Sequence, residues 1–391
     1  MYPKNHDAPP EQPIPIPPAL AALRDRIDAV DLKLVDLLAR RHALIADVAS
    51  VKRTSGVPIK DSAREHDMLQ VRRAQADAAG LSPDTIEGLF RVLLRASRDR
   101  QAGLRAAVPE DLRLCTVAII GAHGAMGTLW TKLLQTVGHE VLGVDLDTDL
   151  SARDAAAAAD VVLVSVPIDV TEHVIEMVGP VMHDAALLTD ITSVKQMPVD
   201  AMLKHANCAV IGTHPLFGPS VRSLQNQRLA IVPARDNDNS WLPWLDTTYR
   251  SLGLTLIETE ASTHDRIMSV VQVLTHHATE VMGRTMQRLG VSVEETLQFT
   301  SPVYRMELLM TARHFAQNPD LYRAIEAGNP NCHAVTKAFK ASADEFSEAL
   351  AQGNADAFRS MFMEVTAFMG SFAQGALEQS SSLIERLVEM E

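Results

Sequence analysis

The chain has 391 residues, which is enough for two or three domains. Its hydrophobic content of 47% excludes a disordered or fibrous protein, and its formal net charge of −13 argues against a nucleic-acid-binding protein, which needs a basic face. The charge is uneven, because residues 1–105 carry 17 Lys and Arg against 14 Asp and Glu. The N-terminal quarter is therefore where we expect an anionic small molecule to bind.

The N-terminal composition and the cysteines indicate a cytoplasmic protein. The first 18 residues are rich in proline and lack the apolar core of a signal peptide, so we expect a disordered lead-in. No run approaches the roughly 18 apolar residues of a membrane-spanning helix. Cys115, Cys208 and Cys332 share no metal-ligand spacing and are expected to be buried, reduced thiols. No metal site is predicted.

Residues 19–105 have the pattern of an all-helical domain. Over residues 19–52 apolar side chains recur with a helical period, and neither Gly nor Pro interrupts them. Two further helices are predicted over 62–79 and 83–104. A helix of about 34 residues spans about 50 Å and cannot cover its own apolar stripe. We therefore expect a helical bundle that a second copy of the chain completes, giving a homodimer.

Residues 110–261 have the pattern of an α/β domain, because predicted strands alternate with helices in the manner of a Rossmann-type, doubly wound parallel sheet. Residues 262–391 are helical in pattern, and we expect an all-helical domain there that dimerises and closes over the substrate. The whole is a multidomain chain of α and α/β parts. The predicted strands cover 114–120, 141–144, 161–166, 186–190, 209–212, 229–232 and 254–257, and predicted helices cover 125–137, 155–159 and 170–178.

A glycine-rich turn follows the first predicted strand, in the sequence Gly121-Ala122-His123-Gly124-Ala125-Met126-Gly127. Ala122 replaces the first glycine of the dinucleotide fingerprint G-x-G-x-x-G, and we expect Gly121 to make the tight turn instead. Gly124 would let the backbone approach a pyrophosphate, and Gly127 would let the helix pack on the strand. The N-terminus of the helix would then hold the pyrophosphate.

Asp145 ends the next predicted strand, 21 residues after Gly124. A carboxylate at this place accepts hydrogen bonds from ribose hydroxyls and repels a 2′-phosphate, so the sequence favours NAD over NADP. A third predicted strand ends in the sequence Ser165-Val166-Pro167-Ile168, at a place where ligands of such sheets bind. The predicted NAD-binding residues are Gly121, Ala122, Gly124, Met126, Gly127, Asp145, Ser165, Val166 and Pro167.

Cationic side chains recur along the N-terminal helices. Arg41 and Lys52 are 11 residues apart, which is close to three helical turns, so they share a face. Arg24 lies 17 residues before Arg41, about 25 Å along the same helix, so a small ligand cannot touch both in one chain. On spacing alone, ordinary solvated charges are the alternative interpretation. An antiparallel second chain would bring its own Arg24 to the distant site.

The segment from Arg24 to Gln101 resembles the all-helical class of chorismate mutases. The Claisen rearrangement of chorismate to prephenate needs a dianion held in a reactive conformation and no nucleophile, which suits these residue types. The resemblance implies that Lys52 and Gln101 are catalytic and donate to the ether oxygen. It also implies substrate-binding roles for Arg24, Arg41, Asp61, Arg64 and Ser97.

Polar sequences follow two strands, at 190–195 and 211–219, and two more lie at 301–305 and 311–317. They are similar to prephenate dehydrogenases, and the order of the parts resembles the fused T-protein family of bacterial tyrosine synthesis. The resemblance implies that His214 accepts the C4 hydroxyl proton as hydride leaves for NAD. It further implies catalytic roles for Ser193, which bonds that hydroxyl, and Arg313, which clamps a carboxylate. Second-rank substrate-binding candidates are Lys195, Gln317 and Arg305.

The expected function is a bifunctional enzyme that converts chorismate to prephenate and then, with NAD, to 4-hydroxyphenylpyruvate, with tyrosine as the feedback inhibitor that the resemblance implies. The first alternative is a single-activity NAD dehydrogenase whose N-terminal helices only dimerise or regulate it, which predicts no chorismate consumption. The second is an NAD-binding sensor, which predicts NAD binding without prephenate-dependent NADH formation. Neither nucleic acid nor membrane is an expected partner.

Overall fold

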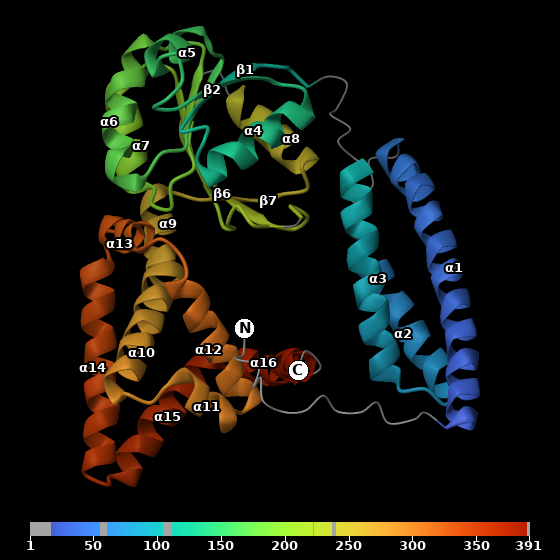
Figure 1. The fold of residues 1–391 in the computed structure, drawn as a ribbon. Helices are drawn as coiled ribbons and strands as arrows, with labels where there is room; N and C mark the ends of the chain where they lie inside the picture. The colour runs from blue at the N-terminus through green and yellow to red at the C-terminus, as the bar shows by residue number, and fades with distance from the viewer. Residues whose placement is uncertain (1–16, 55–60, 105–111, 222, 237–239, 389–391) are drawn as a thin grey trace, which may run out of the picture. The chain divides into compact units, whose positions relative to one another are not determined.

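The computed structural model describes residues 17–54, 61–104, 112–221, 223–236 and 240–388. The chain divides into two compact units, Met1–Ala107 and Val108–Glu391 (Figure 1). Most of the predicted lead-in, residues 1–16, lies outside the described residues. Pro18, which was expected to belong to it, is helical, because proline fits the first turn of a helix.

Three helices make up the described part of the N-terminal unit, as predicted. α1 (Pro18–Thr54) has 37 residues and is about 55 Å long. α2 (Ser62–Ala78) is capped by Asp61, whose carboxylate accepts a hydrogen bond from the Arg64 N–H at 3.0 Å. α3 (Pro83–Leu104) begins with a proline and packs against both other helices.

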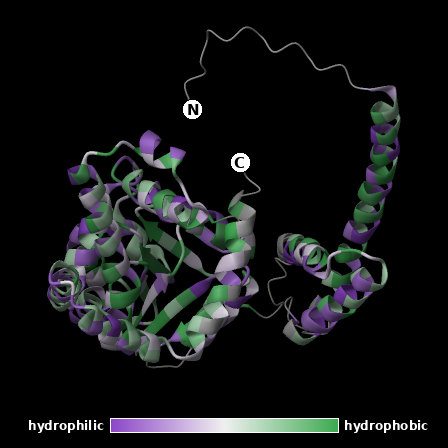
Figure 2. Ribbon diagram, turned by 90° about the horizontal axis from the view of Figure 1, so that it is seen from below, coloured by the Kyte–Doolittle hydropathy of each residue, from purple (hydrophilic) through white to green (hydrophobic). Residues whose placement is uncertain are grey.

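One stripe of α1 is apolar and exposed. Leu23, Ile27, Val30, Leu34 and Leu37 are each between 51% and 59% exposed. Figure 2 shows apolar residues, in green, interspersed with hydrophilic ones, in purple, along the helix at the right. Since each Å² of apolar surface left in water forgoes about 25 cal/mol, a stripe of this length favours a helical partner.

The second unit is built around a seven-stranded sheet in the order β2-β1-β3-β4-β5-β6-β7. β1 to β5 are parallel, as predicted for a Rossmann-type sheet, whereas at one edge β6 is antiparallel to β5 and β7 is parallel to β6. The described residues between β5 and β6 contain no helix to make the crossover that a parallel pair requires. The strands are β1 (Thr116–Ile120), β2 (Glu140–Val144), β3 (Val161–Val164), β4 (Leu187–Asp190), β5 (Ala209–Pro215), β6 (Arg228–Arg235) and β7 (Thr255–Glu258).

Helices cover both faces of the sheet in a three-layer arrangement (Figure 1). Buried apolar clusters fill both interfaces, one around Ile175 and Met202 and the other around Trp130 and Leu245. α7 and α8 are absent from the predicted elements. One face carries α5 (Ala152–Ala158), α6 (Ile168–Val178) with the short η1 (Gly179–Val181), and α7 (Gln196–His205), and the other carries α4 (Ala125–Val137) and α8 (Trp241–Ser251).

The C-terminal part is helical throughout its described residues, as predicted. Cys115 and Cys208 are buried thiols, but Cys332 in this part is only half-buried, because it lies at the start of a helix beside a cavity. None of the described helices has the length and apolar character to span a bilayer. The elements are α9 (Ala261–Met268), η2 (Ser269–Leu274), α10 (Thr275–Leu289), α11 (Val293–Gln298), α12 (Pro302–Phe315), α13 (Pro319–Gly328), α14 (Cys332–Ala351), α15 (Ala355–Met369) and α16 (Ser371–Val388).

Candidate active sites

A cavity of about 220 Å³, here called the N-terminal cavity, is lined by all three helices of the first unit. Four cationic side chains and two carboxylates form part of its wall, so the wall carries a net positive charge that suits an anion. Six of the seven residues predicted for the mutase site are among those that line it. The lining residues are Arg41, Ile45, Val48, Lys52, Asp61, Arg64, Glu65, Leu94, Ser97, Arg98 and Gln101.

Ser97 connects two of the predicted residues in this cavity. Arg41 Nη1 donates to Ser97 Oγ at 2.6 Å, and Gln101 Nε2 donates to the Ser97 carbonyl at 3.3 Å. Gln101 is buried, and within the described structure its Oε1 has no hydrogen-bond partner. Because such a buried polar atom costs about 1–3 kcal/mol, the cavity is built to receive a polar ligand or water there.

Arg98 is a cavity residue that the sequence analysis missed. Its Nη1 donates to both carboxylate oxygens of Glu65, at 2.6 and 2.7 Å. Arg98 and Glu65 lie 33 residues apart on different helices, so no local spacing rule pairs them. The ion pair fixes α2 against α3 at the cavity wall.

Arg24 is the predicted residue that one chain does not bring to the N-terminal cavity. It is exposed on α1 and is not among the lining residues. The helix is continuous from Arg24 to Arg41, so the two positions are about 25 Å apart along its axis. The prediction that a single chain cannot gather both ends is confirmed.

The glycine-rich turn joins β1 to α4 with little space for side chains. Gly121 has φ +91°, and a Cβ on it would lie 2.3 Å from the Ser165 carbonyl oxygen. A Cβ on Gly127 would lie 2.1 Å from the Gly121 carbonyl oxygen. Gly121 therefore makes the tight turn, and the methyl group of Ala122 is tolerated beside Gly143, whose own Cβ would lie 3.2 Å from it.

Asp145 lies directly after β2 and beside this turn. Its Oδ2 accepts the His123 N–H at 2.8 Å, and its Oδ1 accepts the Leu146 N–H at 2.9 Å. Gly124 caps α4 with no side-chain hydrogen bond, so the N–H groups of its first turn are open to a ligand. A backbone cradle, a helix N-terminus and a nearby carboxylate together fit a dinucleotide.

His214 lies at the end of β5 and is buried, with 3% of its surface exposed. Burial, the neighbouring His264 and the Lys195 charge lower the pKa of His214 well below 6.5, so its imidazole is neutral at cellular pH. Ser193 is half-buried in the loop after β4. β4 and β5 are adjacent and parallel, so their carboxyl ends place Ser193 and His214 at the same edge of the sheet.

The Lys195 side chain is surrounded by hydrogen-bond partners from the protein interior. It is fully buried, and its ammonium donates to Asp190 and, at 2.7 Å, to the Thr213 carbonyl oxygen. Burial lowers the pKa of Lys195, and the Asp190 carboxylate opposes that shift. Lys195 was expected to contact the substrate. Instead its ammonium bonds Asp190 of β4 and Thr213 of β5, the strand that carries His214, because a buried ammonium needs such partners.

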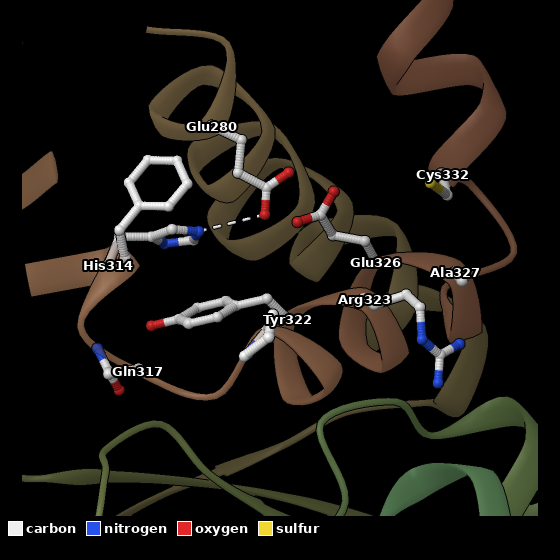
Figure 3. Close-up of a pocket in the computed structure, with 10 residues that line it drawn as sticks. Glu280, His314, Gln317, Tyr322, Arg323, Glu326, Ala327 and Cys332 are labelled. Carbon is white, nitrogen blue, oxygen red and sulfur yellow. Dashed lines mark hydrogen bonds and ion pairs between the residues drawn. The ribbon is translucent and has the colours of Figure 1, made fainter. Parts of the chain in front are cut away.

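Arg305, Arg313 and Gln317 lie on or just after α12, and Gln317 donates to the Arg313 carbonyl at 3.2 Å. Arg313 is exposed, and Gln317 lines a cavity of about 570 Å³, here called the C-terminal cavity. Figure 3 shows that His314 and Tyr322 face each other in it, with ring centroids 3.9 Å apart. No predicted motif included Tyr322, because the residues around it in the sequence match none of the catalytic or binding motifs.

Two carboxylates, Glu280 and Glu326, point toward each other in the C-terminal cavity (Figure 3). Burial and the charge of Glu280 raise the pKa of Glu326 to about 7, so the Glu326 carboxyl is partly protonated near neutral pH. His314 Nε2 lies 3.2 Å from Glu280 Oε1. His277, Glu280 and Glu326 bring ligand atoms within 4.8 Å of one another, a grouping that could hold a metal ion where the sequence analysis predicted none.

Comparisons with known proteins agree with this division. The family chorismate mutase type II matches residues 23–102, the prephenate dehydrogenase nucleotide-binding domain matches 134–258, and the prephenate dehydrogenase dimerization domain matches 260–364. A T-protein of Enterobacter agglomerans is 37% identical over 93% of this chain and 97% of its own length. A T-protein of Haemophilus influenzae is 33% identical over 94% of this chain and 97% of its own length.

Among solved structures, the second unit has the fold of prephenate dehydrogenase from Aquifex aeolicus, a protein solved with hydroxyphenyl propionate and NAD+. That structure has a TM-score of 0.55 and 19% identity, and it aligns over 66% of this chain and 98% of its own. With these matches, the cation-lined helical bundle and the Rossmann-type unit define an enzyme with two activities, a mutase and a dehydrogenase. The chain belongs to the T-protein family, which joins chorismate mutase to prephenate dehydrogenase in tyrosine biosynthesis.

Proposed function

We propose that the dehydrogenase half uses NAD and that the turn between β1 and α4 holds it. The open N–H groups at the start of α4 would bind the pyrophosphate, and Asp145 would bind the adenosine ribose. Met126 is partly buried against the apolar cluster around Trp130. Ser165, Val166 and Pro167 follow the adjacent strand β3, where they would border the nicotinamide half of NAD. When bound, NAD supplies the hydride acceptor.

We propose His214 as the general base of prephenate oxidation. As hydride leaves ring C4, the imidazole accepts the proton of the C4 hydroxyl. The bond from ring C1 to its carboxylate then breaks, carbon dioxide leaves, and the electron pair makes the ring aromatic. The proton returns to the phenolic oxygen, so His214 ends as it began. The observation that supports this role is its neutral, buried imidazole at the carboxyl end of β5.

Ser193 and Arg313 complete the proposed dehydrogenase site. Ser193 would donate to the C4 hydroxyl oxygen, and Arg313 would bind a substrate carboxylate through its guanidinium. Burial raises the pKa of Tyr322, and the positive charge of Arg313 partly opposes that rise. Arg313 therefore acts electrostatically on the Tyr322 side chain. Gln317 and Arg305 remain second-rank candidates on the same helix segment.

We propose that the N-terminal cavity rearranges chorismate. Arg41 and Arg64 would hold the two carboxylates, and Lys52 and Gln101 would donate to the ether oxygen as its bond breaks. Asp61 lines the same wall and would accept from the substrate hydroxyl. Because an amide donates without being protonated, we expect the mutase to keep its rate at neutral pH.

We propose that two chains interlock through α1 in an antiparallel arrangement, so that each supplies Arg24 to the cavity of the other. The exposed apolar stripe of α1 and the distance from Arg24 to Arg41 support this arrangement. The C-terminal helices, which match a dimerization domain, would add a second contact. Tyrosine is the feedback inhibitor that we propose.

One assay tests the proposed function as a whole. Purified protein is given chorismate with and without NAD, and chorismate, prephenate and NADH are followed separately. We expect prephenate to accumulate without NAD, NADH to form when NAD is added, and added tyrosine to slow NADH formation. Chorismate that stays unconsumed would support the single-activity alternative, and NAD binding without NADH formation would support the sensor.

Replacing Gly127 with Ala is expected to weaken NAD binding at least about tenfold, because the new Cβ lies 2.1 Å from the Gly121 carbonyl oxygen and must distort the turn. The Kd for NAD, measured by fluorescence titration, checks this. Gly375→Ala is the matched control, since its Cβ would meet no atom nearer than 3.9 Å. Equal NAD affinity in both variants would contradict the proposed cradle.

Mixed dimers test the shared mutase site. Arg24→Ala and Lys52→Ala are each expected to lack mutase activity alone. Coexpressed with different tags, they should regain about one quarter of the wild-type activity, because half of the dimers are mixed and each has one intact site. If the mixture stays as inactive as its parents, Arg24 and Lys52 act in the same chain and the proposed arrangement is wrong.

A further inference from the structure

A line of three buried polar side chains runs back from His214 into the protein. His214 Nδ1 lies 2.9 Å from His264 Nε2, and His264 Nδ1 lies 2.8 Å from Asp265 Oδ1. The three side chains come from β5 and α9, 50 residues apart, and are at most 3% exposed. None of the sequence motifs included His264 or Asp265.

Asp265 is held in place by the start of α7. Its Oδ1 accepts the Lys195 N–H at 2.7 Å, and its Oδ2 accepts the Gln196 N–H at 2.9 Å. A helix N-terminus favours a negative charge, so these bonds suit an ionised carboxylate. The Asn329 side chain donates to the Asp265 carbonyl at 2.8 Å and fixes the backbone as well.

The order of donors and acceptors along this line follows from the carboxylate. An ionised carboxylate only accepts, so the hydrogen of the His264–Asp265 bond must be on His264 Nδ1. A neutral His264 then has a lone pair on Nε2 and accepts from His214 Nδ1–H. The lone pair of a neutral His214 is therefore on Nε2, the nitrogen that faces away from His264.

We propose that His264 and Asp265 are positioning residues that hold His214 in the tautomer with a free Nε2 lone pair. This inference rests on the proposed role of His214 as the base that takes the C4 hydroxyl proton. A base with its hydrogen on the wrong nitrogen would have no lone pair to offer the substrate. When Nε2 takes the proton, the resulting imidazolium keeps its bond to His264, and the Asp265 carboxylate stabilises the positive charge.

Asp265→Asn should reverse the donor and acceptor roles in both hydrogen bonds of this line. The Asn amide would donate to His264 Nδ1, which would put the hydrogen of His264 on Nε2 and that of His214 on Nε2 as well. We expect kcat for prephenate oxidation to fall about 10²–10⁴-fold while the KM for prephenate changes less than about threefold. Chorismate mutase activity should be unchanged, which also reports on folding.

A pair of substitutions at His264 tests the same idea without touching the helix contacts of Asp265. His264→Gln keeps an acceptor for His214 Nδ1–H and should lose less than about tenfold in kcat, whereas His264→Leu removes the acceptor and should lose more than about a hundredfold. His139→Leu is the matched control, because His139 is also buried in this unit but pairs with the Cys115 N–H. Equal losses in the Gln and Leu variants would overturn the proposal.

The tautomer can be observed directly in the full-length protein labelled with ¹⁵N-histidine. At neutral pH we expect a pyridine-type shift for His214 Nε2, with assignment by loss of the signal in His214→Asn, and a reversal to a pyrrole-type shift in Asp265→Asn. A protonated Nε2 in the wild-type protein would overturn the inference. Because this measurement does not depend on turnover, it tests the tautomer of His214 separately from its role as the base. The kinetics of His214→Asn test that role.

Discussion

Replacing His214 with Asn is expected to lower kcat for prephenate oxidation by at least about 10²–10⁴-fold, the contribution of a positioned general base. Asn approximates the shape of the imidazole and can donate or accept a hydrogen bond, but it cannot take up a proton at cellular pH. NADH formation from prephenate at saturating NAD measures the loss. Chorismate consumption by the same preparation should stay within about twofold of wild type, because the mutase cavity lies wholly within the N-terminal unit.

The control for this substitution is His183→Asn, an exposed histidine of the same unit, which should change neither activity. The pH dependence gives a second check. Since the pKa of His214 is well below 6.5, wild-type oxidation should keep its rate as the pH falls from about 8 to 6.5 and lose it only at lower pH, when the imidazole takes up a proton. Equal loss of both activities in His214→Asn would instead indicate misfolding or a shared site.

Lys52→Ala is expected to have the converse effect. The ammonium would stabilise the negative charge that develops on the ether oxygen, and removing one such donor lowers kcat by about 10²–10³-fold. The rate of chorismate disappearance without NAD measures this loss. Prephenate oxidation should be unchanged, because all residues proposed for it belong to the second unit.

Lys33→Ala provides the matched control for Lys52, since Lys33 is an exposed cation on the same helix and does not line the cavity. It should leave chorismate turnover at the wild-type rate. If Lys33→Ala slows the mutase as much as Lys52→Ala does, the effect is a general one of charge on α1, and the role proposed for Lys52 is wrong. Together, the His214 and Lys52 variants should show that the two activities can be removed separately.

Much of the fold was predictable because its signals are local. The uninterrupted helical period before Gly56 predicted α1, and the glycine turn between a β-rich run and a helix predicted the start of the sheet domain. The orientation of β6 was not predictable in this way, because an apolar strand has the same pattern in either direction. It depends on whether the connecting chain folds into a crossover helix, and the described residues of that connection do not.

The sequence by itself determined which chemistry each half can perform. Arg41 and Lys52 share one face of α1, and Ser97 and Gln101 share one face of α3, because helical spacing is fixed. The motif around His214 marks the end of a strand. The tertiary structure alone decided what surrounds these groups. His264 meets His214 across 50 residues, and Arg98 meets Glu65 across 33, because packing joins elements without regard to their separation in the chain. Hydrogen-bond partners and burial are properties of that packing, and they fix charge, tautomer and access.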